Sequence, residues 1–219
     1  VYKRQVMNGV FITGSNTNVG KTIVGIEIIK FLSKTRSVKA RKPVETNCQI
    51  VNGNYLPRDA EALNNACFKQ EPLNKVCPFC FELEASPEDA SLDVGTPISL
   101  DQLSDACHTG VEGSFVVIEG AGGLYSPIAD GALNSDLAIQ LKVPIVIVIR
   151  DELGAISQAL MSIEKEKKNN LEVSCVILNE IIPNSLSNKK GLIKYTNVPV
   201  ISFSKKRMGH FYSDIEGLF

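Results

Sequence analysis

The chain has 219 residues, of which 44% are hydrophobic and 21% are charged, and its formal net charge is −1. A chain of this size and composition can bury a full core, and it lacks the excess of positive charge that is typical of nucleic-acid-binding proteins. Because no apolar run approaches the roughly 18–20 residues of a membrane span, we expect neither nucleic acid nor a membrane as a partner.

The cysteines are scattered along the chain, at positions 48, 67, 77, 80, 107 and 175. In a chain of this size they indicate reduced thiols and a cytoplasmic protein. The stretch CPFC (77–80) has the C-x-x-C form, but no second pair and no nearby histidine completes a zinc site. We therefore interpret these two cysteines as incidental thiols in a loop.

The first residues, VYKRQ, fit none of the patterns that follow. They match one reading frame of a transposon end used in sequencing libraries, and a scar of this kind is not part of a protein's fold. We expect residues 1–6 to be a non-native leader and residues 7–219 to form a single domain.

Apolar runs and helical patterns then alternate along the chain. In the first half we expect a strand over 9–13, a helix over 21–34, a strand over 38–44 and a helix over 56–67, followed by loops with short elements over 68–98. In the second half we expect a strand over 114–123 that enters a glycine turn, a helix over 134–142, a strand over 143–149, a helix over 154–168, and strands over 173–179 and 198–202. Near-continuous Val and Ile runs indicate strands covered on both faces, so we predict one α/β domain with a mostly parallel central sheet and helices on both faces.

A glycine loop, GSNTNVGKT (14–22), lies between the first strand and the first helix. Glycines let backbone N–H groups approach phosphate oxygens, Lys21 can bridge the β- and γ-phosphates, and the Thr22 hydroxyl can ligate Mg²⁺. Five residues separate Gly14 from Gly20, whereas the common form has four. The strand before the loop and the helix after it nevertheless predict nucleotide binding and a fold like that of P-loop NTPases.

Charged residues follow two of the predicted strands. Glu119 comes directly after FVVI (115–118), at the edge where open α/β sheets hold their ligands, and is a candidate metal ligand. Lys42 ends another strand at the same edge. It could stabilise charge on a transferring phosphoryl group, or it could be a solvated lysine. Asp59, in the first turn of a helix, is either a metal ligand or an acid that complements the helix dipole.

Four motifs in this order resemble the dethiobiotin synthetase family: TGSNTNVGKT (13–22), KPVET (42–46), RDAEAL (58–63) and VIEGAGGLYSPI (117–128). Further similarity runs through 143–160 to 177–182, so the resemblance covers most of the chain from Val10 to about Ile182. The family's phosphate loop has the same five-residue spacing.

The resemblance implies an ATP-dependent ring-closing ligase of biotin biosynthesis, which converts 7,8-diaminopelargonate and CO2 to dethiobiotin with release of ADP and phosphate. One amine captures CO2 as a carbamate, ATP phosphorylates it to a carbamic-phosphoric anhydride, and the second amine closes the ring. The implied partners are these small molecules, Mg²⁺, and a second copy of the chain in a homodimer.

The resemblance also assigns roles to residues. The catalytic residues would be Lys42, Lys21 and Thr17, and the Mg²⁺ ligands would be Thr22, Asp59 and Glu119. The nucleotide would contact Asn18, Val19, Gly20, Lys21, Thr22, Ile23, Asp59, Glu119, Gly120, Ala121, Gly122 and Asn179, the last of which would read the adenine edge. The substrate would contact Thr17 and Thr46 in one subunit and a helix start in the other, at Gly154, Ile156 and Ser157.

Two stretches depart from the family pattern. Glu88, within ASPEDAS (85–91), stands where the family usually has a histidine. The segment VPVISFSKKR (198–207) lacks the usual Gly-x-Ile-Pro that helps to hold adenine, which leaves the base selectivity open. Neither departure removes a catalytic group.

Two other classes of protein share parts of this pattern. Partitioning or regulatory ATPases with a deviant phosphate loop usually carry a second lysine in that loop, and SNTNV (15–19) has none. Amide-forming ligases such as those of cobyrinate amidation need a glutamine-hydrolysing domain, for which no room remains. The dethiobiotin synthetase reaction is therefore the leading hypothesis, and the partitioning ATPase is the alternative.

Overall fold

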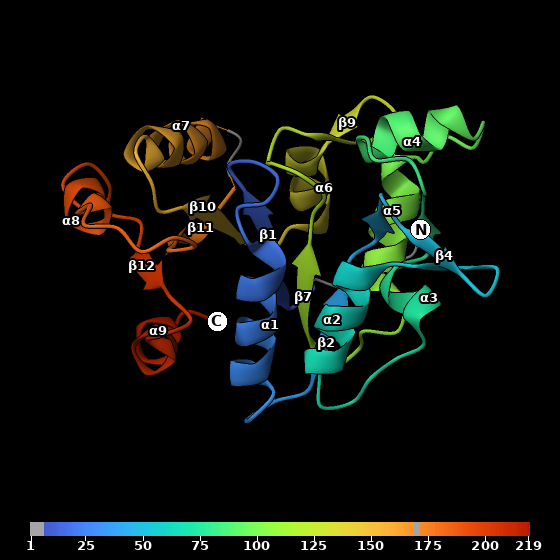
Figure 1. The fold of residues 1–219 in the computed structure, drawn as a ribbon. Coiled ribbons are helices and arrows are strands. Elements are labelled where there is room, and N and C mark those ends of the chain that lie inside the picture. The colour runs from blue at the N-terminus through green and yellow to red at the C-terminus, as the bar shows by residue number, and fades with distance from the viewer. Residues whose placement is uncertain (1–6, 169–170) are drawn as a thin grey trace.

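A six-stranded parallel sheet lies at the centre of the computed structural model, which describes residues 7–168 and 171–219 (Figure 1). The strand order is β12-β11-β10-β1-β7-β2, and every neighbouring pair is parallel. The strands are β1 (Gly9–Gly14), β2 (Val38–Arg41), β7 (Phe115–Glu119), β10 (Ile145–Arg150), β11 (Val173–Asn179) and β12 (Val200–Phe203). The predicted parallel α/β sheet is confirmed.

The two faces of the sheet build two separate hydrophobic cores. In β10, Ile145, Ile147 and Ile149 belong to one core, whereas Val146 and Val148 belong to the other. Successive side chains of a strand point to opposite faces, so a strand covered on both sides is apolar throughout rather than alternating. This is why the central strands could be predicted from uninterrupted Val and Ile runs.

Helices cover both faces. One core contains residues of α1 (Lys21–Leu32), α2 (Arg58–Ala66), α3 (Leu73–Val76) and α9 (Met208–Ile215). The other contains residues of α4 (Pro87–Asp93), α5 (Leu100–His108), α6 (Asn134–Leu141), α7 (Ala155–Lys168) and α8 (Asn188–Leu192). Figure 1 shows α1 and α6 on opposite sides of β1 and β7. Within residues 7–168 and 171–219, no helix is long and apolar enough to cross a membrane.

The strand predicted over 38–44 is wrong beyond Arg41. The chain leaves the main sheet at Lys42, and a separate strand β3 (Val44–Glu45) pairs with β6 (Phe79–Cys80). The cause is Pro43, which has no N–H to donate to a sheet ladder. The Lys42 N–H turns instead to the carbonyl of Val76, at 3.0 Å.

Several elements were not expected from the sequence. Two hairpins were missed: β4 (Gln49–Val51) with β5 (Asn54–Leu56), and β8 (Pro127–Ala129) with β9 (Ala132–Leu133). The first turns at Asn52 and Gly53, whose φ angles of 51° and 77° are those of the left-handed region, as an Asn-Gly hairpin turn requires. Helices α5, α8 and α9 were also missed. The expected leader, residues 1–6, lies outside the described residues, so the domain boundary at Met7 stays a prediction.

Candidate active site

The phosphate loop connects β1 to α1, and its last residue has a backbone conformation that requires glycine. Gly20, the residue before α1, has a φ of 94°. A Cβ at this position would lie 2.1 Å from Nδ2 of Asn179, so both the backbone conformation and the space require glycine. Among the described residues, no side chain caps α1. Its first N–H groups and its positive dipole end therefore suit an anion.

The Lys21 side chain folds back over this loop. Its ammonium donates a hydrogen bond to the carbonyl of Asn16 at 3.1 Å, and the residue is buried. Burial is the main cause that lowers the pKa of Lys21 to about 8; Glu119 opposes the decrease and the neighbouring Lys42 adds to it. The loop thus holds a lysine that a bound phosphate would stabilise in its charged form.

Lys42 and Glu119 meet at the carboxyl ends of neighbouring strands. Their strands β2 and β7 are paired, with Arg41 opposite Ile118, so the residue after β2 lies beside the last residue of β7. The Lys42 ammonium donates to Oε1 of Glu119 at 2.8 Å and to the carbonyl of Gly120 at 3.3 Å. Lys42 is only 4% exposed, so the alternative of a solvated strand-end lysine is wrong.

Carboxylates around Lys42 keep it charged. Burial alone would lower its pKa, but the charges of Glu119, Asp59 and Glu45 outweigh burial and raise the pKa above the ordinary value of a lysine. Burial in turn raises the pKa of Glu45, against the opposing effect of Lys42. The site therefore contains one firmly protonated lysine, Lys42, and one that is easily deprotonated, Lys21.

Oxygen donors suitable for a divalent cation surround Glu119. The Thr22 hydroxyl donates to Oε1 of Glu119 at 3.0 Å, and Asp59 lies half-exposed, 3.8 Å from the Lys42 ammonium. The second carboxylate oxygen of Glu119, Oε2, is buried without a hydrogen-bond partner within the described part of the chain. A hydroxyl, two carboxylates and phosphate oxygens are the ligands that Mg²⁺ prefers, so these residues fit the ion.

The described side chains alone do not form a complete metal site. No group of three or more His, Cys, Asp or Glu side chains suited to a metal occurs among the described residues. An ion held by Thr22, Asp59 and Glu119 would therefore need ligands from a nucleotide or from water, which is how Mg²⁺ is usually bound in phosphate sites.

A cavity of about 630 Å³ joins the loop to this cluster. It is lined by most of the predicted site residues: Thr17, Asn18, Gly20, Lys21, Thr22, Ile23, Lys42, Thr46, Asp59, Glu119, Ala121 and Gly122. Its other lining residues, which sequence reasoning missed, are Glu45, Asn47, Glu84, Ala85 and Ile181. Glu45 lies inside the KPVET motif and could have been found there, whereas nothing in the sequence points to Glu84, Ala85 or Ile181.

Some predicted residues do not line this cavity. Val19 and Gly120 are not among its lining residues, and the Gly120 carbonyl accepts a hydrogen bond from the Lys42 ammonium. Asn179 is buried at the end of β11 and donates from Nδ2 to the carbonyl of Val19 at 2.8 Å. The Asn179 amide therefore supports the phosphate loop, and its proposed contact with adenine stays a prediction.

The predicted substrate residues of the other subunit lie at the start of α7. Gly154 precedes the helix, and Ile156 and Ser157 are in its first turn. Because α7 packs on the opposite face of the sheet from α1, these residues do not join the cavity of their own chain. The neighbouring Leu153 is 88% exposed.

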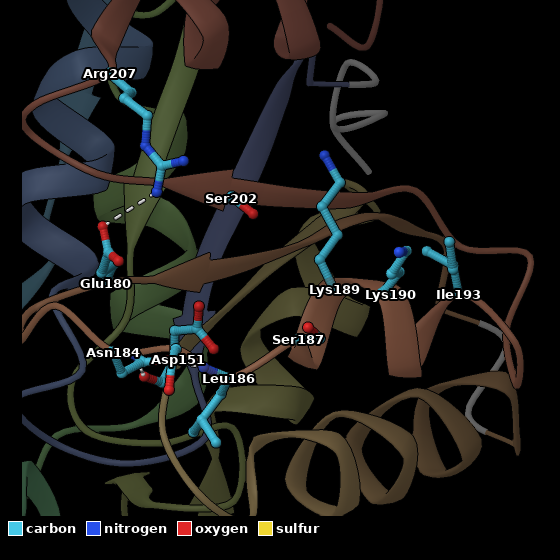
Figure 2. Close-up of a pocket in the computed structure, with 11 residues that line it drawn as sticks. Asp151, Glu180, Asn184, Leu186, Ser187, Lys189, Lys190, Ile193, Ser202 and Arg207 are labelled. Carbon is cyan, nitrogen blue, oxygen red and sulfur yellow. Dashed lines mark hydrogen bonds and ion pairs between the residues drawn. The ribbon is translucent and has the colours of Figure 1, made fainter.

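A second cavity, of about 480 Å³, lies beyond the loop that follows β11 (Figure 2). Figure 2 shows the ion pair of Glu180 with Arg207, whose atoms are 3.3 Å apart, and the Ser202 hydroxyl at the same pocket. Glu180 lines this cavity and the next residue, Ile181, lines the first. The two cavities therefore lie on either side of one loop.

The CPFC cysteines and Glu88, which the sequence singled out, line neither cavity. The Sγ atoms of Cys77 and Cys80 are 3.7 Å apart and both thiols are free, and Cys80 belongs to β6 rather than to a loop. Glu88 accepts a hydrogen bond from the Gly131 N–H at 2.7 Å. It thereby ties α4 to the turn between β8 and β9.

Comparisons with known proteins agree with this geometry. The sequence matches the AAA domain family over residues 8–203. It is 46% identical over 210 residues to the ATP-dependent dethiobiotin synthetase BioD of Vesicomyosocius okutanii, covering 96% of each chain. It is 46% identical over 205 residues to the BioD of Ruthia magnifica, covering 94% of this chain and 95% of the relative.

Among solved structures, the septum site-determining protein MinD of Pyrococcus horikoshii has a TM-score of 0.55 at 16% identity, covering 95% of this chain and 86% of the other. A ParA family ATPase of Chlorobium tepidum has a TM-score of 0.53 at 12% identity, covering 97% and 90%. These similarities support the P-loop NTPase-like fold alone. On the sequence relationship, which spans nearly the whole chain, this protein belongs to the ATP-dependent dethiobiotin synthetase family.

Proposed function

We propose that this protein closes the ureido ring of dethiobiotin from 7,8-diaminopelargonate, CO2 and ATP. The observation that carries the proposal is the buried Lys42 ammonium, 2.8 Å from Glu119, in the same cavity as the phosphate loop. A reaction between a carbamate and a triphosphate must bring two negatively charged groups together. A fixed cation between them is the electrostatic stabilisation that such a transition state needs.

The chemistry would proceed in three balanced steps. One amine adds to CO2 and loses a proton, giving a carbamate. A carbamate oxygen attacks the γ-phosphorus of ATP and ADP leaves, giving a carbamic-phosphoric anhydride. The second amine then attacks the carbonyl carbon, loses a proton and expels phosphate as the ring closes.

Lys42 would act in these steps as a permanent charge. The carboxylates around it raise its pKa, so it is a poor general base and a good electrostatic partner for the carbamate and the γ-phosphate. Lys21, at the first position of α1, would contact the nucleotide phosphates, and Thr17 and Thr46 would contact the carbamate or the diamine. Mg²⁺, held by Thr22, Asp59 and Glu119, would supply neutralisation of phosphate charge when bound.

The nucleoside would extend from the phosphate loop toward the second cavity. The support is that Glu180 and Ile181, on one loop after Asn179, line the two cavities. This direction would bring the base near Ser202 and Arg207, in the segment where the family's usual Gly-x-Ile-Pro is missing.

We also propose a homodimer located in the cytoplasm. Large apolar side chains lie exposed just before α7, within it and in the loop after β11: Leu153, Met161 and Ile182 are exposed by 88%, 64% and 61%. A second copy that covers them would bring Gly154, Ile156 and Ser157 toward the cavity of its partner, where free N–H groups of a helix start could bind the substrate carboxylate.

The test is phosphate release from Mg-ATP with bicarbonate, measured with and without 7,8-diaminopelargonate. We expect release that requires the diamine and falls about 100-fold or more in a Lys42→Ala variant, as for the loss of one preorganised charge in an active site. Phosphate release that does not depend on the diamine and is unchanged by the substitution would overturn the proposal and favour a regulatory ATPase.

A further inference from the structure

The helix that carries Asp59 has no cap of its own. Helix α2 begins at Arg58, and its N-cap residue is Pro57, whose side chain accepts no hydrogen bond. The N–H groups of the second and third helical residues are those that an N-cap side chain normally satisfies. In this helix they belong to Asp59 and Ala60, and Ala60 is fully buried.

Glu45 supplies the missing cap from a different part of the chain. Its Oε1 accepts from the Asp59 N–H at 3.0 Å and its Oε2 accepts from the Ala60 N–H at 2.9 Å. One carboxylate thus binds two of the first N–H groups of α2, which have no partner within the helix. Its negative charge also lies at the positive end of the helix dipole.

Glu45 is itself held firmly. It belongs to β3, where it lies opposite Cys80 of β6, and its carbonyl accepts from the Phe81 N–H at 3.0 Å. The residue is 7% exposed. Its carboxylate is therefore held in one position, and its two hydrogen bonds fix the position of the start of α2.

We infer that Glu45 is a positioning residue for the divalent cation that the site uses, acting through Asp59. The hydrogen bond from the backbone N–H of Asp59 to Glu45 fixes the position of the Asp59 backbone. The Asp59 side chain extends from there, and its Oδ2 lies 3.8 Å from the Lys42 ammonium. This inference rests on the proposed function, in which Asp59, Thr22 and Glu119 hold Mg²⁺. Groups that orient a metal ligand contribute to affinity without touching the ion.

The test measures Mg²⁺ binding to the protein–ADP complex by calorimetric titration, which does not depend on turnover. We expect Glu45→Gln, which keeps the shape but loses the charge and one acceptor, to weaken Mg²⁺ binding by about 10-fold, within the range for residues that orient metal ligands. Asp59→Asn should weaken it at least as much. The double variant should bind no more weakly than Asp59→Asn alone, because the two residues act through one group.

Ser99→Ala is the matched control. Ser99 caps α5 by accepting from the Gln102 N–H, and no residue of this helix lines the cavity, so this variant should lower the thermal midpoint without changing Mg²⁺ affinity. If Glu45→Gln behaves in the same way while Asp59→Asn loses Mg²⁺, Glu45 is only a helix cap and the inference is overturned. Additive losses in the double variant would also overturn it.

Failure of the Mg²⁺ assignment has a different signature, since Asp59→Asn would then leave Mg²⁺ affinity unchanged, and failure of the proposed function shows instead as phosphate release that does not require the diamine. Should Glu45→Gln not fold, Glu45→Asp carries the same test. Its shorter side chain keeps the charge but cannot span both N–H groups, and we expect Mg²⁺ binding to be weakened there as well.

Discussion

The Lys42 ammonium and the Glu119 carboxylate form a buried ion pair, 2.8 Å apart, with side-chain exposures of 5% and 1%. Such a pair is costly to break from one side, because the partner left behind is a buried charge without compensation. The pair therefore links the stability of the fold to the chemistry of the site, and this link can be tested separately from activity.

We predict that Lys42→Met destabilises the protein by about 3–5 kcal/mol, the usual cost of removing one partner of a buried pair. Glu119→Gln added to Lys42→Met should recover a large part of that loss, because the most buried of the carboxylates around Lys42 then carries no charge. Urea unfolding of the two single variants and the double variant measures the free energy of unfolding. Strictly additive losses would mean that the pair is not coupled in solution.

Lys21 should oppose stability in the absence of a nucleotide. Its pKa falls from 10.5 to about 8 in the fold, mainly through burial, so holding it charged at neutral pH costs about 1–3 kcal/mol. Lys21→Met should therefore raise the free energy of unfolding of the nucleotide-free protein at pH 7 while it weakens ADP binding. A destabilised Lys21→Met variant would contradict this prediction.

The sign of the pH effect follows from the same shift. Below pH 8 the lysine is protonated in both the folded and unfolded states, and its cost is fully present. As pH rises from about 8 to 10.5, the folded protein releases its proton first and the cost disappears. The stability advantage of Lys21→Met should shrink over this range, which unfolding curves at pH 7, 8.5 and 9.5 can follow.

Nucleotide affinity should fall as pH rises above 8. A bound phosphate favours the charged form of Lys21 and so raises its pKa above the free value of about 8. Between the two values, binding takes up a proton, and the dissociation constant for ADP should rise by up to about tenfold per pH unit. Fluorescence titration with ADP from pH 7.5 to 9.5 measures this slope.

Lys21→Arg is the control for this slope. Arginine remains charged throughout this range, so the dissociation constant of the variant should be flat with pH, whatever its absolute value. The same slope in both proteins would assign the titration to another group.

The parts of the fold that could be predicted are those in which local sequence and burial agree. The run from Ile145 to Ile149 is buried on both faces, and its strand was predicted from hydrophobicity alone. Lys42 and Glu119 were found because both lie near the carboxyl end of a predicted strand, and parallel strands end at one edge. Their mutual contact followed from the pairing of β2 with β7, which the sequence does not reveal.

Two kinds of feature were missed. Some had readable local signals, such as the Asn52-Gly53 turn and the capping box of Ser99 with Gln102. Others join residues far apart in the chain: Glu45 caps a helix that starts 13 positions later, and Asn179 binds the carbonyl of Val19, 160 positions away. Contacts of this second kind depend on how the elements pack, so no pattern in a single sequence contains them.

The contact between Asn179 and the phosphate loop leads to a prediction about Gly20. An alanine there would have to adopt a φ of 94° and would bring its Cβ to 2.1 Å from the Asn179 amide. The backbone strain alone is worth about 1 kcal/mol, and the clash adds to it, since the amide is buried and bonded to Val19. Gly20→Ala should therefore lose more stability than strain alone explains, and it should bind ADP more weakly.

Gly95→Ala separates the two causes. Gly95 also has a positive φ, of 68°, but a Cβ there would meet nothing within 4 Å, so this variant reports the backbone strain without a clash. The difference between the two variants in urea unfolding measures the contact with Asn179. Because that contact is the only one near the added Cβ in the described structure, Asn179→Ala combined with Gly20→Ala should remove most of the difference. If both glycine variants lose the same free energy, the loop does not rest on Asn179 in solution.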